Sequence, residues 1–188
     1  MFKKVVSCLA VLLVALFFSL SVAQSATVGF GDAVFRDMDS WYMALWLVGH
    51  TGIYIGGGKV VHMQGSGCEK ADMSNFTNTR YWGSFYSGNY FAAKNRVDEA
   101  NTFLSPKAIY DFWSYKNFSG NSPKGRCDGL VEHCFEKFGA NVVNDYHWST
   151  LTPQTQWRSN KISRRYTTSR GKTAYNTDVI PLIPGIFE

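Results

Sequence analysis

The stretch that decides the fold is His50-Thr51-Gly52-Ile53-Tyr54-Ile55-Gly56-Gly57-Gly58-Lys59-Val60-Val61-His62-Met63. Two runs rich in β-branched and aromatic residues flank three glycines, which predicts a β-hairpin because glycine supplies the positive φ angles of a tight turn. If Gly56–Gly58 form a three-residue loop, Gly52 lies opposite His62. Side chains alternate between the two faces of a strand, so His50 and His62 become diagonal neighbours on one face.

The two histidines also have a plainer interpretation. They could be unrelated residues on a partly exposed sheet, and a two-residue loop would move His62 to the opposite face, because a one-residue slip inverts every side chain. No cysteine or carboxylate lies at zinc-ligand spacing from either histidine. We therefore expect no metal and no cofactor at this hairpin.

A second informative stretch is the amphipathic helix that the sequence predicts over residues 127–138, followed by Gly139 as a typical helix terminator. Cys127 opens this helix, where the helix dipole and the free backbone N–H groups lower the pKa of a thiol and can bind an oxyanion. Cys134 belongs to the apolar stripe and is expected in the core. Taken alone, a lone cysteine such as Cys127 is better interpreted as an inert, half-buried thiol.

A cysteine at a helix N-terminus and a histidine on a strand can form a thiolate–imidazole pair, in which the histidine acts as the base that activates the nucleophile. Here the candidate pair is Cys127 and His50, with His62 as a polar third member that orients the imidazole. Gln64 is the alternative third member if the hairpin has the other register.

These motifs resemble a known family. Cys127-Asp128-Gly129-Leu130-Val131 is similar to the nucleophile helix of NlpC-type cell-wall cysteine peptidases, and residues 50–56 with Val60-Val61-His62 resemble their histidine strands. Histidine precedes cysteine, as in the circularly permuted branch that includes lecithin:retinol acyltransferase-like proteins and permuted bacterial amidases. Gly31-Asp32-Ala33-Val34 and Tyr110-Asp111-Phe112 also fit that branch.

The resemblance covers about residues 30–140 and implies an α+β, permuted papain-like fold, in which an antiparallel sheet packs against the cysteine helix. It also implies that Cys127 is the nucleophile, His50 the base and His62 the third member. One departure from the family pattern is Asp128 in place of the usual serine, which places a negative charge beside the thiol. Arg126, on the other side of the cysteine, can offset that charge.

The N-terminus predicts a secretory signal peptide over residues 1–23. Lys3 and Lys4 precede an apolar run, Val5–Leu20, that is shorter than the roughly 20 residues of a membrane-spanning helix. We expect cleavage after Ala23, or alternatively after Ala26, and a secreted or periplasmic protein. Residues 24–188 then form one domain with a basic C-terminal extension over 149–188.

Removal of the signal peptide leaves three cysteines. Seven residues of helix, at about 1.5 Å each, keep Cys127 and Cys134 too far apart to bridge. A Cys68–Cys134 disulfide and a chain without any disulfide remain as the two alternatives. In both, Cys127 stays a free thiol.

Elsewhere the sequence is less informative. Trp41–Val48 fits either a short helix or a buried strand, and Ser105–Trp113 predicts a helix with Pro106 at its first position. Residues 64–92 predict a long loop with one strand near Tyr90–Ala93. The aromatic side chains of this loop could line a substrate groove or cap the sheet, and the last forty residues predict mostly irregular structure.

Composition limits the function. The chain has 188 residues, 45% of them hydrophobic, which excludes general disorder, and a formal net charge of +5, too small to indicate nucleic-acid binding by itself. The sequence favours a monomeric cysteine hydrolase that cleaves an amide bond in cell-wall peptide. The alternatives are a lipid acyltransferase or thioesterase with the same triad and an inactive envelope-binding domain. Basic residues over Arg158–Lys172 could contact an anionic envelope surface, although such runs are usually solvated.

Overall fold

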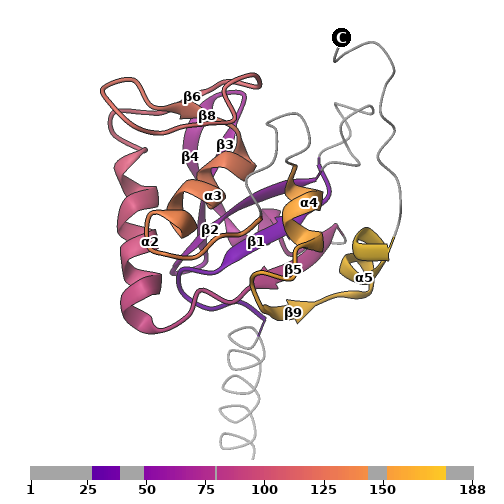
Figure 1. Ribbon diagram of the computed structural model, residues 1–188. Coiled ribbons are helices and arrows are strands. Elements are labelled where there is room, and N and C mark those ends of the chain that lie inside the picture. Colours follow the sequence, from indigo (N-terminus) through magenta and orange to yellow (C-terminus); the bar gives the residue numbers. More distant parts are fainter. Residues whose placement is uncertain (1–26, 39–48, 79, 144–151, 177–188) are drawn as a thin grey trace, which may run out of the picture.

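A computed structural model describes residues 27–38, 49–78, 80–143 and 152–176. They form an α+β structure around a six-stranded antiparallel sheet with the order β4-β3-β2-β1-β5-β9 (Figure 1). The expected α+β class with an antiparallel sheet is confirmed. The strands are β1 (Ala33–Arg36), β2 (His50–Gly56), β3 (Lys59–Gln64), β4 (Gly67–Asp72), β5 (Tyr81–Phe85) and β9 (Arg164–Thr167).

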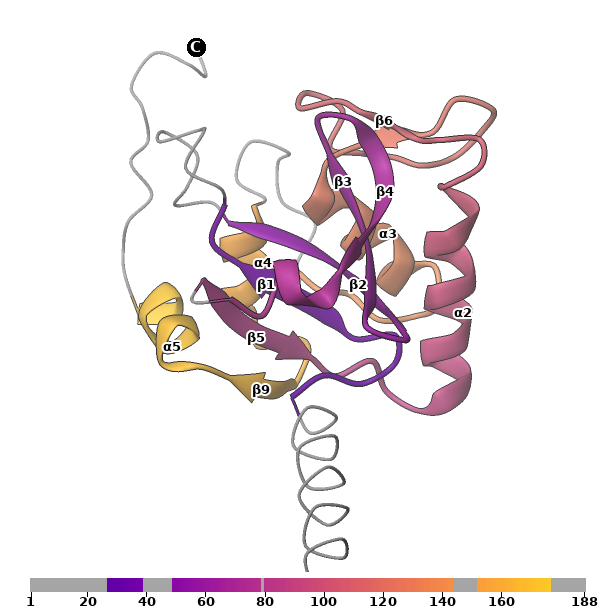
Figure 2. The same cartoon turned by 180° about the vertical axis from the view of Figure 1, so that it is seen from behind.

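Helices α2 (Tyr90–Thr102) and α3 (Cys127–Glu136) cover one face of the sheet, as the two opposite views show (Figures 1 and 2). Ile53 and Val61 point to that face and are fully buried in the main core. The other face carries a smaller apolar cluster that includes Val60 and Phe76, beside the short helix η1 (Met73–Asn75). Because both faces are apolar, the central strands read as nearly continuous hydrophobic runs in the sequence.

The hairpin register agrees with the sequence prediction, although its turn differs in detail. Gly52 lies opposite His62, as expected, but Gly56 rather than Ile55 pairs with Lys59. The turn is therefore the two residues Gly57 and Gly58, both with positive φ, and an irregularity between Tyr54 and Gly56 supplies the extra residue. This β-bulge restores the face that a plain two-residue turn would have inverted, so His50 and His62 share one face.

Two predictions for the middle of the chain are wrong. Residues 64–92 are not a long loop, because they contain β4, η1 and β5, and the strand expected at Tyr90–Ala93 is the first turn of α2. The Asn89 side chain starts this helix by accepting a hydrogen bond from the backbone N–H of Ala92, at 3.0 Å. The cap signal was present in the sequence, but the Gly, Ser and Asn residues around it favoured a loop.

The helix expected over Ser105–Trp113 does not form. The backbone N–H of Ile109 bonds to Pro123 at 3.0 Å, and the carbonyl of Ala108 accepts from Cys68 at 2.9 Å. These groups are therefore committed to neighbouring strands rather than to helical partners. The segment instead contributes β6 (Ile109–Tyr110) to a small sheet with β8 (Lys124–Gly125) and β7 (Lys116–Asn117).

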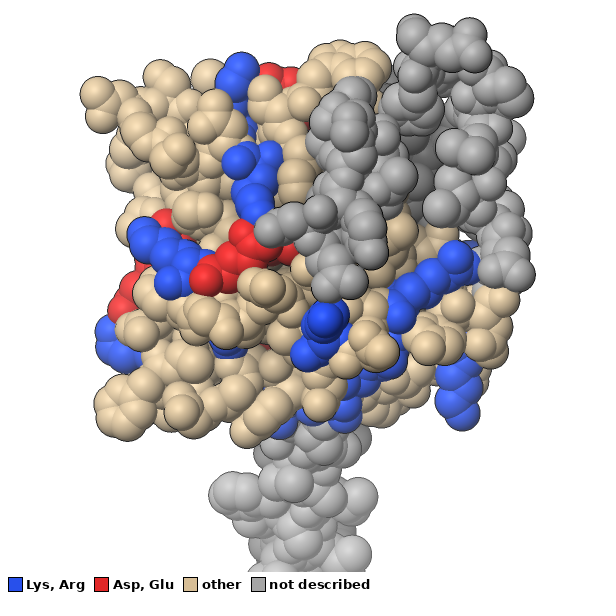
Figure 3. Space-filling view, in the orientation of Figure 1, with Lys and Arg blue, Asp and Glu red and all other residues tan. Residues whose placement is uncertain are grey.

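The C-terminal region is more regular than expected. It contains α4 (Pro153–Arg158), β9 at the edge of the main sheet, and α5 (Ser169–Asn176). Arg165 pairs with buried Asp32, Arg170 pairs with Asp37 at 2.7 Å, and the Arg164 guanidinium lies 5.0 Å from the Trp157 ring centre. Basic side chains lie along the lower right of Figure 3, where Figure 1 places β9 and α5. Several residues of the predicted anionic-surface patch therefore have structural partners within the fold.

Two of the sequence predictions lie outside the described residues. These are the signal peptide over residues 1–23 and the undecided segment Trp41–Val48. Within the part of the chain that the structure describes, no helix has the length and apolar character needed to cross a membrane.

Gly129 allows the cysteine helix to pack closely against its neighbouring loop. A Cβ atom added at this position would lie 1.7 Å from the backbone carbonyl oxygen of Tyr115, a contact that cannot exist without a backbone shift. The glycine in the Cys-Asp-Gly motif is therefore required by packing. Its position fixes the start of α3, and with it the thiol, against the rest of the fold.

We expect Gly129→Ala to lower the free energy of unfolding by roughly 2 kcal/mol, because the overpacking penalty exceeds the gain of about 1 kcal/mol in helix propensity. Urea denaturation measures this change. Gly65→Ala is the matched control, since a Cβ atom there meets nothing within 4 Å. Equal stability of the two variants would contradict the close contact.

Candidate functional site

The Cys127 thiol lies at the N-terminus of α3, against strand β2. Its side chain is 4% exposed. The sulfur accepts hydrogen bonds from the backbone N–H groups of Thr51 and Asp128. One donor thus comes from the sheet and the other from the first turn of the helix, so the nucleophile predicted from the sequence lies where these two elements meet.

The strand ladder explains why Thr51 can bond to the sulfur. The pairing between β2 and β3 runs from Gly52–His62 to Gly56–Lys59 and stops before Thr51. Successive N–H groups on a strand point to alternate sides, and the Tyr54 N–H points toward β1 because it bonds to Asp32 at 2.8 Å. The Thr51 N–H therefore points away from β1, at a position where β3 no longer pairs with β2. It donates a hydrogen bond to the Cys127 sulfur instead.

The two predicted histidines are in direct contact. His50 Nε2 lies 2.9 Å from His62 Nδ1, the rings are perpendicular, and the residues are only 4% and 3% exposed. Buried Phe76 packs against both rings, with its centre 5.6 Å from each. His62 thus occupies Nε2 of His50 and leaves Nδ1 as the other ring nitrogen, and Thr51, whose backbone N–H bonds to the Cys127 sulfur, is the next residue along β2.

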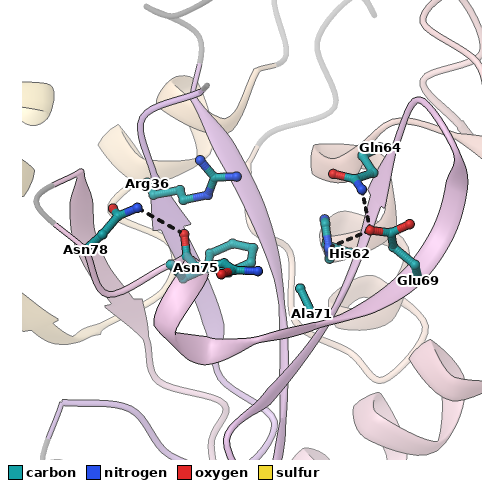
Figure 4. A pocket seen from close by; sticks show the side chains of 8 residues that line it. Arg36, His62, Gln64, Glu69, Ala71, Asn75 and Asn78 are labelled. Carbon is teal, nitrogen blue, oxygen red and sulfur yellow. Dashed lines mark hydrogen bonds and ion pairs between the residues drawn. The ribbon is translucent and has the colours of Figure 1, made fainter. Parts of the chain in front are cut away.

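Gln64, the alternative third member, has a different partner. Its side-chain amide donates to Glu69 on β4, whereas His62 contacts His50 directly. Glu69 also lies 3.7 Å from His62 Nε2, and Figure 4 shows Gln64, His62 and Glu69 pointing toward one another. The geometry thus favours His62 over Gln64 as the residue that orients His50.

A polar cavity of about 250 Å³ opens beside His62 and does not include Cys127. Figure 4 shows the Arg36 side chain facing the His62–Glu69 group across it. Seven of its eight lining residues carry a polar or aromatic side chain, so the cavity suits a small hydrophilic group. The lining residues are Arg36, His62, Gln64, Glu69, Ala71, Asn75, Phe76 and Asn78.

The electrostatics of the thiol differ from the sequence expectation. Burial, followed by the negative charge of Asp128, raises the pKa of Cys127 to about 12, although the backbone N–H of Thr51 and the Arg126 guanidinium act in the opposite direction. Arg126 binds Asp128 through two hydrogen bonds, at 3.0 and 2.7 Å. Desolvation outweighs the effect of the helix N-terminus. The pKa of Cys127 is therefore raised, whereas the sequence predicted that it would be lowered.

The pKa of His50 is held well below its ordinary value of 6.5, first by burial and then by the nearby His62 and Arg36. At neutral pH Cys127 is therefore a protonated thiol and His50 a neutral imidazole. Such a pair reacts by transferring the thiol proton as the sulfur attacks, rather than from a preformed ion pair.

We expect the raised thiol pKa to make the protein less stable in alkali. Above pH 9.0, the ordinary pKa of cysteine, the unfolded chain loses a proton that folded Cys127 keeps, so stability falls as pH rises from about 9 toward 12. At pH 10 this linkage costs about 1.4 kcal/mol for one such thiol. Urea denaturation at pH 7.5 and pH 10 should show a smaller loss in Cys127→Ala, and an equal loss would contradict the thiol's burial.

The other cysteines are buried and unbridged. Cys68 and Cys134 are 2% and 0% exposed, and together with Cys127 they are free thiols in the structure. This agrees with the alternative that has no disulfide. Cys134 lies in the main core, as its place in the apolar stripe of the helix predicts.

Sequence reasoning missed three contributors to the site, namely Thr51, Phe76 and Glu69. Thr51 acts through its backbone, which no side-chain motif reveals. Glu69 lies opposite His62 in the β3–β4 ladder. A predicted strand at residues 67–72 would have indicated this pair, but Gly65 and Gly67 made the segment resemble a loop.

Comparisons of the chain with known protein families, with curated proteins and with solved structures each returned no match. Within the described ranges, no three His, Cys, Asp or Glu side chains are grouped so that they could bind a metal ion. The functional argument therefore depends on the chemistry of the Cys127–His50–His62 group.

Proposed function

We propose that this protein is an exported cysteine hydrolase with a permuted papain-like fold, which cleaves an amide bond in cell-wall peptide through a thioacyl-enzyme intermediate. The observation that supports the proposal is that Cys127 bonds to the backbone N–H of Thr51, while His50, the preceding residue on β2, bonds to His62 at 2.9 Å. The residues come from separate sequence motifs. Nucleophilic catalysis requires the thiol and its base within hydrogen-bond reach, so the proposal requires His50 Nδ1 to approach the sulfur when substrate binds.

In the proposed reaction, His50 Nδ1 takes the thiol proton while the sulfur of Cys127 attacks the amide carbonyl carbon. The resulting tetrahedral oxyanion can accept hydrogen bonds from backbone N–H groups at the start of α3. His50 then returns the proton to the leaving amine as the C–N bond breaks. Water, deprotonated by the same imidazole, hydrolyses the thioester and restores the thiol.

Access to the thiol requires local movement. With Cys127 only 4% exposed, a carbonyl carbon reaches the sulfur after neighbouring side chains are displaced. Substrate binding that displaces water from a site strengthens the electrostatic interactions within it. We therefore propose that substrate binding, rather than the resting structure, sets the reactivity of this cysteine.

The cavity beside His62 supports a hydrophilic substrate. Its walls carry guanidinium, amide and carboxylate groups, which hydrogen-bond to peptide or sugar and offer little to an acyl chain. This observation favours cell-wall peptide over a phospholipid. Substrates with a polar group close to the scissile amide are the first to test.

The proposal is tested by incubating the protein separately with peptidoglycan fragments and with phospholipid vesicles, and identifying the products by mass spectrometry. We expect new amine and carboxylate termini in the peptide fragments and no change in the lipids. A thioester adduct on Cys127, trapped at low pH, would identify the intermediate. Lipid products alone would support the acyltransferase alternative, and no products from either substrate would favour a binding domain.

A further inference from the structure

Strand β4 places a carboxylate behind the histidine pair. Glu69 lies directly opposite His62 in the antiparallel ladder, with its Oε1 3.7 Å from His62 Nε2. His62 Nδ1 lies 2.9 Å from His50 Nε2. A series of polar groups thus runs from His50 through His62 to Glu69, and Figure 4 shows the His62 and Glu69 part of it.

The proton positions along this series are determined by donor and acceptor logic. If His50 accepts the thiol proton at Nδ1, a neutral His50 carries its own proton at Nε2 and donates it to His62 Nδ1. A neutral His62 must then carry its proton at Nε2, the nitrogen that faces Glu69. This is the one arrangement of neutral tautomers in which every contact joins a donor to an acceptor.

The surroundings of Glu69 keep its carboxylate available as an acceptor. Ser66 Oγ donates to Oε2 at 2.6 Å, and the Gln64 amide donates to Oε1. In both contacts the carboxylate oxygen is the acceptor. The Glu69 side chain is 32% exposed.

The charges around His50 show why such an acid matters. When His50 takes the thiol proton it becomes a cation in a buried position, next to Arg36 on β1 and His62 on β3. On α3, the carboxylate of Asp128 is already bound by Arg126. Glu69 lies opposite His62 in the β3–β4 ladder and so places a carboxylate beside the histidine pair. Its charge is opposite in sign to that of Arg36.

We propose that Glu69 is a positioning residue that fixes the tautomers of His62 and His50 and balances the positive charge formed when the thiol proton is transferred. The inference rests on the proposed hydrolase function. It assigns no contact between Glu69 and the substrate. Its action passes through His62, whose Nε2 it faces.

The kinetic test compares Glu69→Gln with Asp72→Asn in the amidase assay. Asp72 is the matched control because it is an acid on the same strand that pairs across the same ladder, with Lys59 at 2.6 Å. For Glu69→Gln we expect kcat to fall about tenfold with KM unchanged. We also expect the acid limb of the pH–rate profile to move to lower pH, because loss of the negative charge makes the imidazole pair harder to protonate.

A second measurement does not depend on activity. Nitrogen-15 NMR of histidine-labelled protein should show His62 protonated at Nε2 and unprotonated at Nδ1, and this preference should be lost in Glu69→Ala. A His62 that carries its proton at Nδ1 in the unsubstituted protein would overturn the inference, even if every variant failed to fold. An unchanged rate profile in folded Glu69→Gln would overturn it as well.

The two proposals fail in different ways. If Cys127→Ala keeps full activity, the proposed hydrolase mechanism is wrong, whatever the tautomer of His62. If Cys127→Ala is inactive while Glu69→Gln matches the unsubstituted enzyme, the mechanism stands and only the role of Glu69 is lost.

Discussion

Cys127→Ala is expected to reduce amide hydrolysis by about a thousandfold or more, because the reaction then has no nucleophile and only binding and oxyanion stabilisation remain. The variant should fold. Loss of the sulfur leaves the Thr51 N–H without its acceptor, which costs roughly 1–3 kcal/mol. Circular dichroism and urea denaturation, run beside the activity assay, separate the loss of chemistry from the loss of structure.

Cys134→Ala is the matched control for this prediction. Cys134 lies near the C-terminal end of the same helix and is buried as well, so its loss tests the effect of removing a buried thiol away from the helix N-terminus. We expect lower stability and retained activity. Iodoacetamide should also label Cys127 much faster than Cys134, because Cys127 lies at the start of α3 and is 4% exposed, whereas Cys134 is fully buried. Full activity in Cys127→Ala, or equal labelling of the two thiols, would refute the assignment of the nucleophile.

His50→Ala is expected to cost nearly as much as loss of the thiol, since members of a catalytic group act as a unit. Without His50, the proton of a thiol whose pKa is about 12 has no acceptor at neutral pH. His62→Ala should cost less, because an orienting residue is partly replaceable by water. Steady-state kinetics at neutral pH measure all three variants, with kcat as the decisive quantity.

His133→Ala provides the histidine control. His133 lies near the end of α3 and bonds to Glu99 at 2.8 Å, away from the thiol. Its replacement should leave kcat unchanged. If His62→Ala behaves like His133→Ala, His62 does not orient His50, and the 2.9 Å contact between their rings serves packing alone.

The sequence predicts the hairpin and the cysteine helix because each carries strong local signals. Consecutive glycines impose the turn, and the 3.6-residue periodicity after Cys127 identifies the helix. The observed Gly52–His62 register matches the expected one because of a bulge near Ile55. No residue type in the sequence indicates this bulge. For the histidines, the prediction was correct about the face and incorrect about the turn that produces it.

The parts that sequence reasoning missed depend on distant partners. Strand β4 forms by pairing with the edge of β3, and β9 forms by pairing with the edge of β5. Glycines and charged residues make both segments resemble loops in the sequence. The pKa of Cys127 was expected to fall because the helix terminus is visible in the sequence. The burial that raises it is a property of the assembled fold.

The two ion pairs that join the start of the described chain to its end also constrain the order of folding. Asp32 with Arg165, and Asp37 with Arg170, each link residues 133 positions apart, and β9 takes its place in the sheet only beside β5. A chain emerging from the ribosome cannot complete this sheet until about residue 170 has been synthesised. A fragment that stopped at Gly139, where the recognisable motifs end, would lack the edge strand and the Trp157 side chain that fills the core, so the described residues before and after Gly139 fold as one unit.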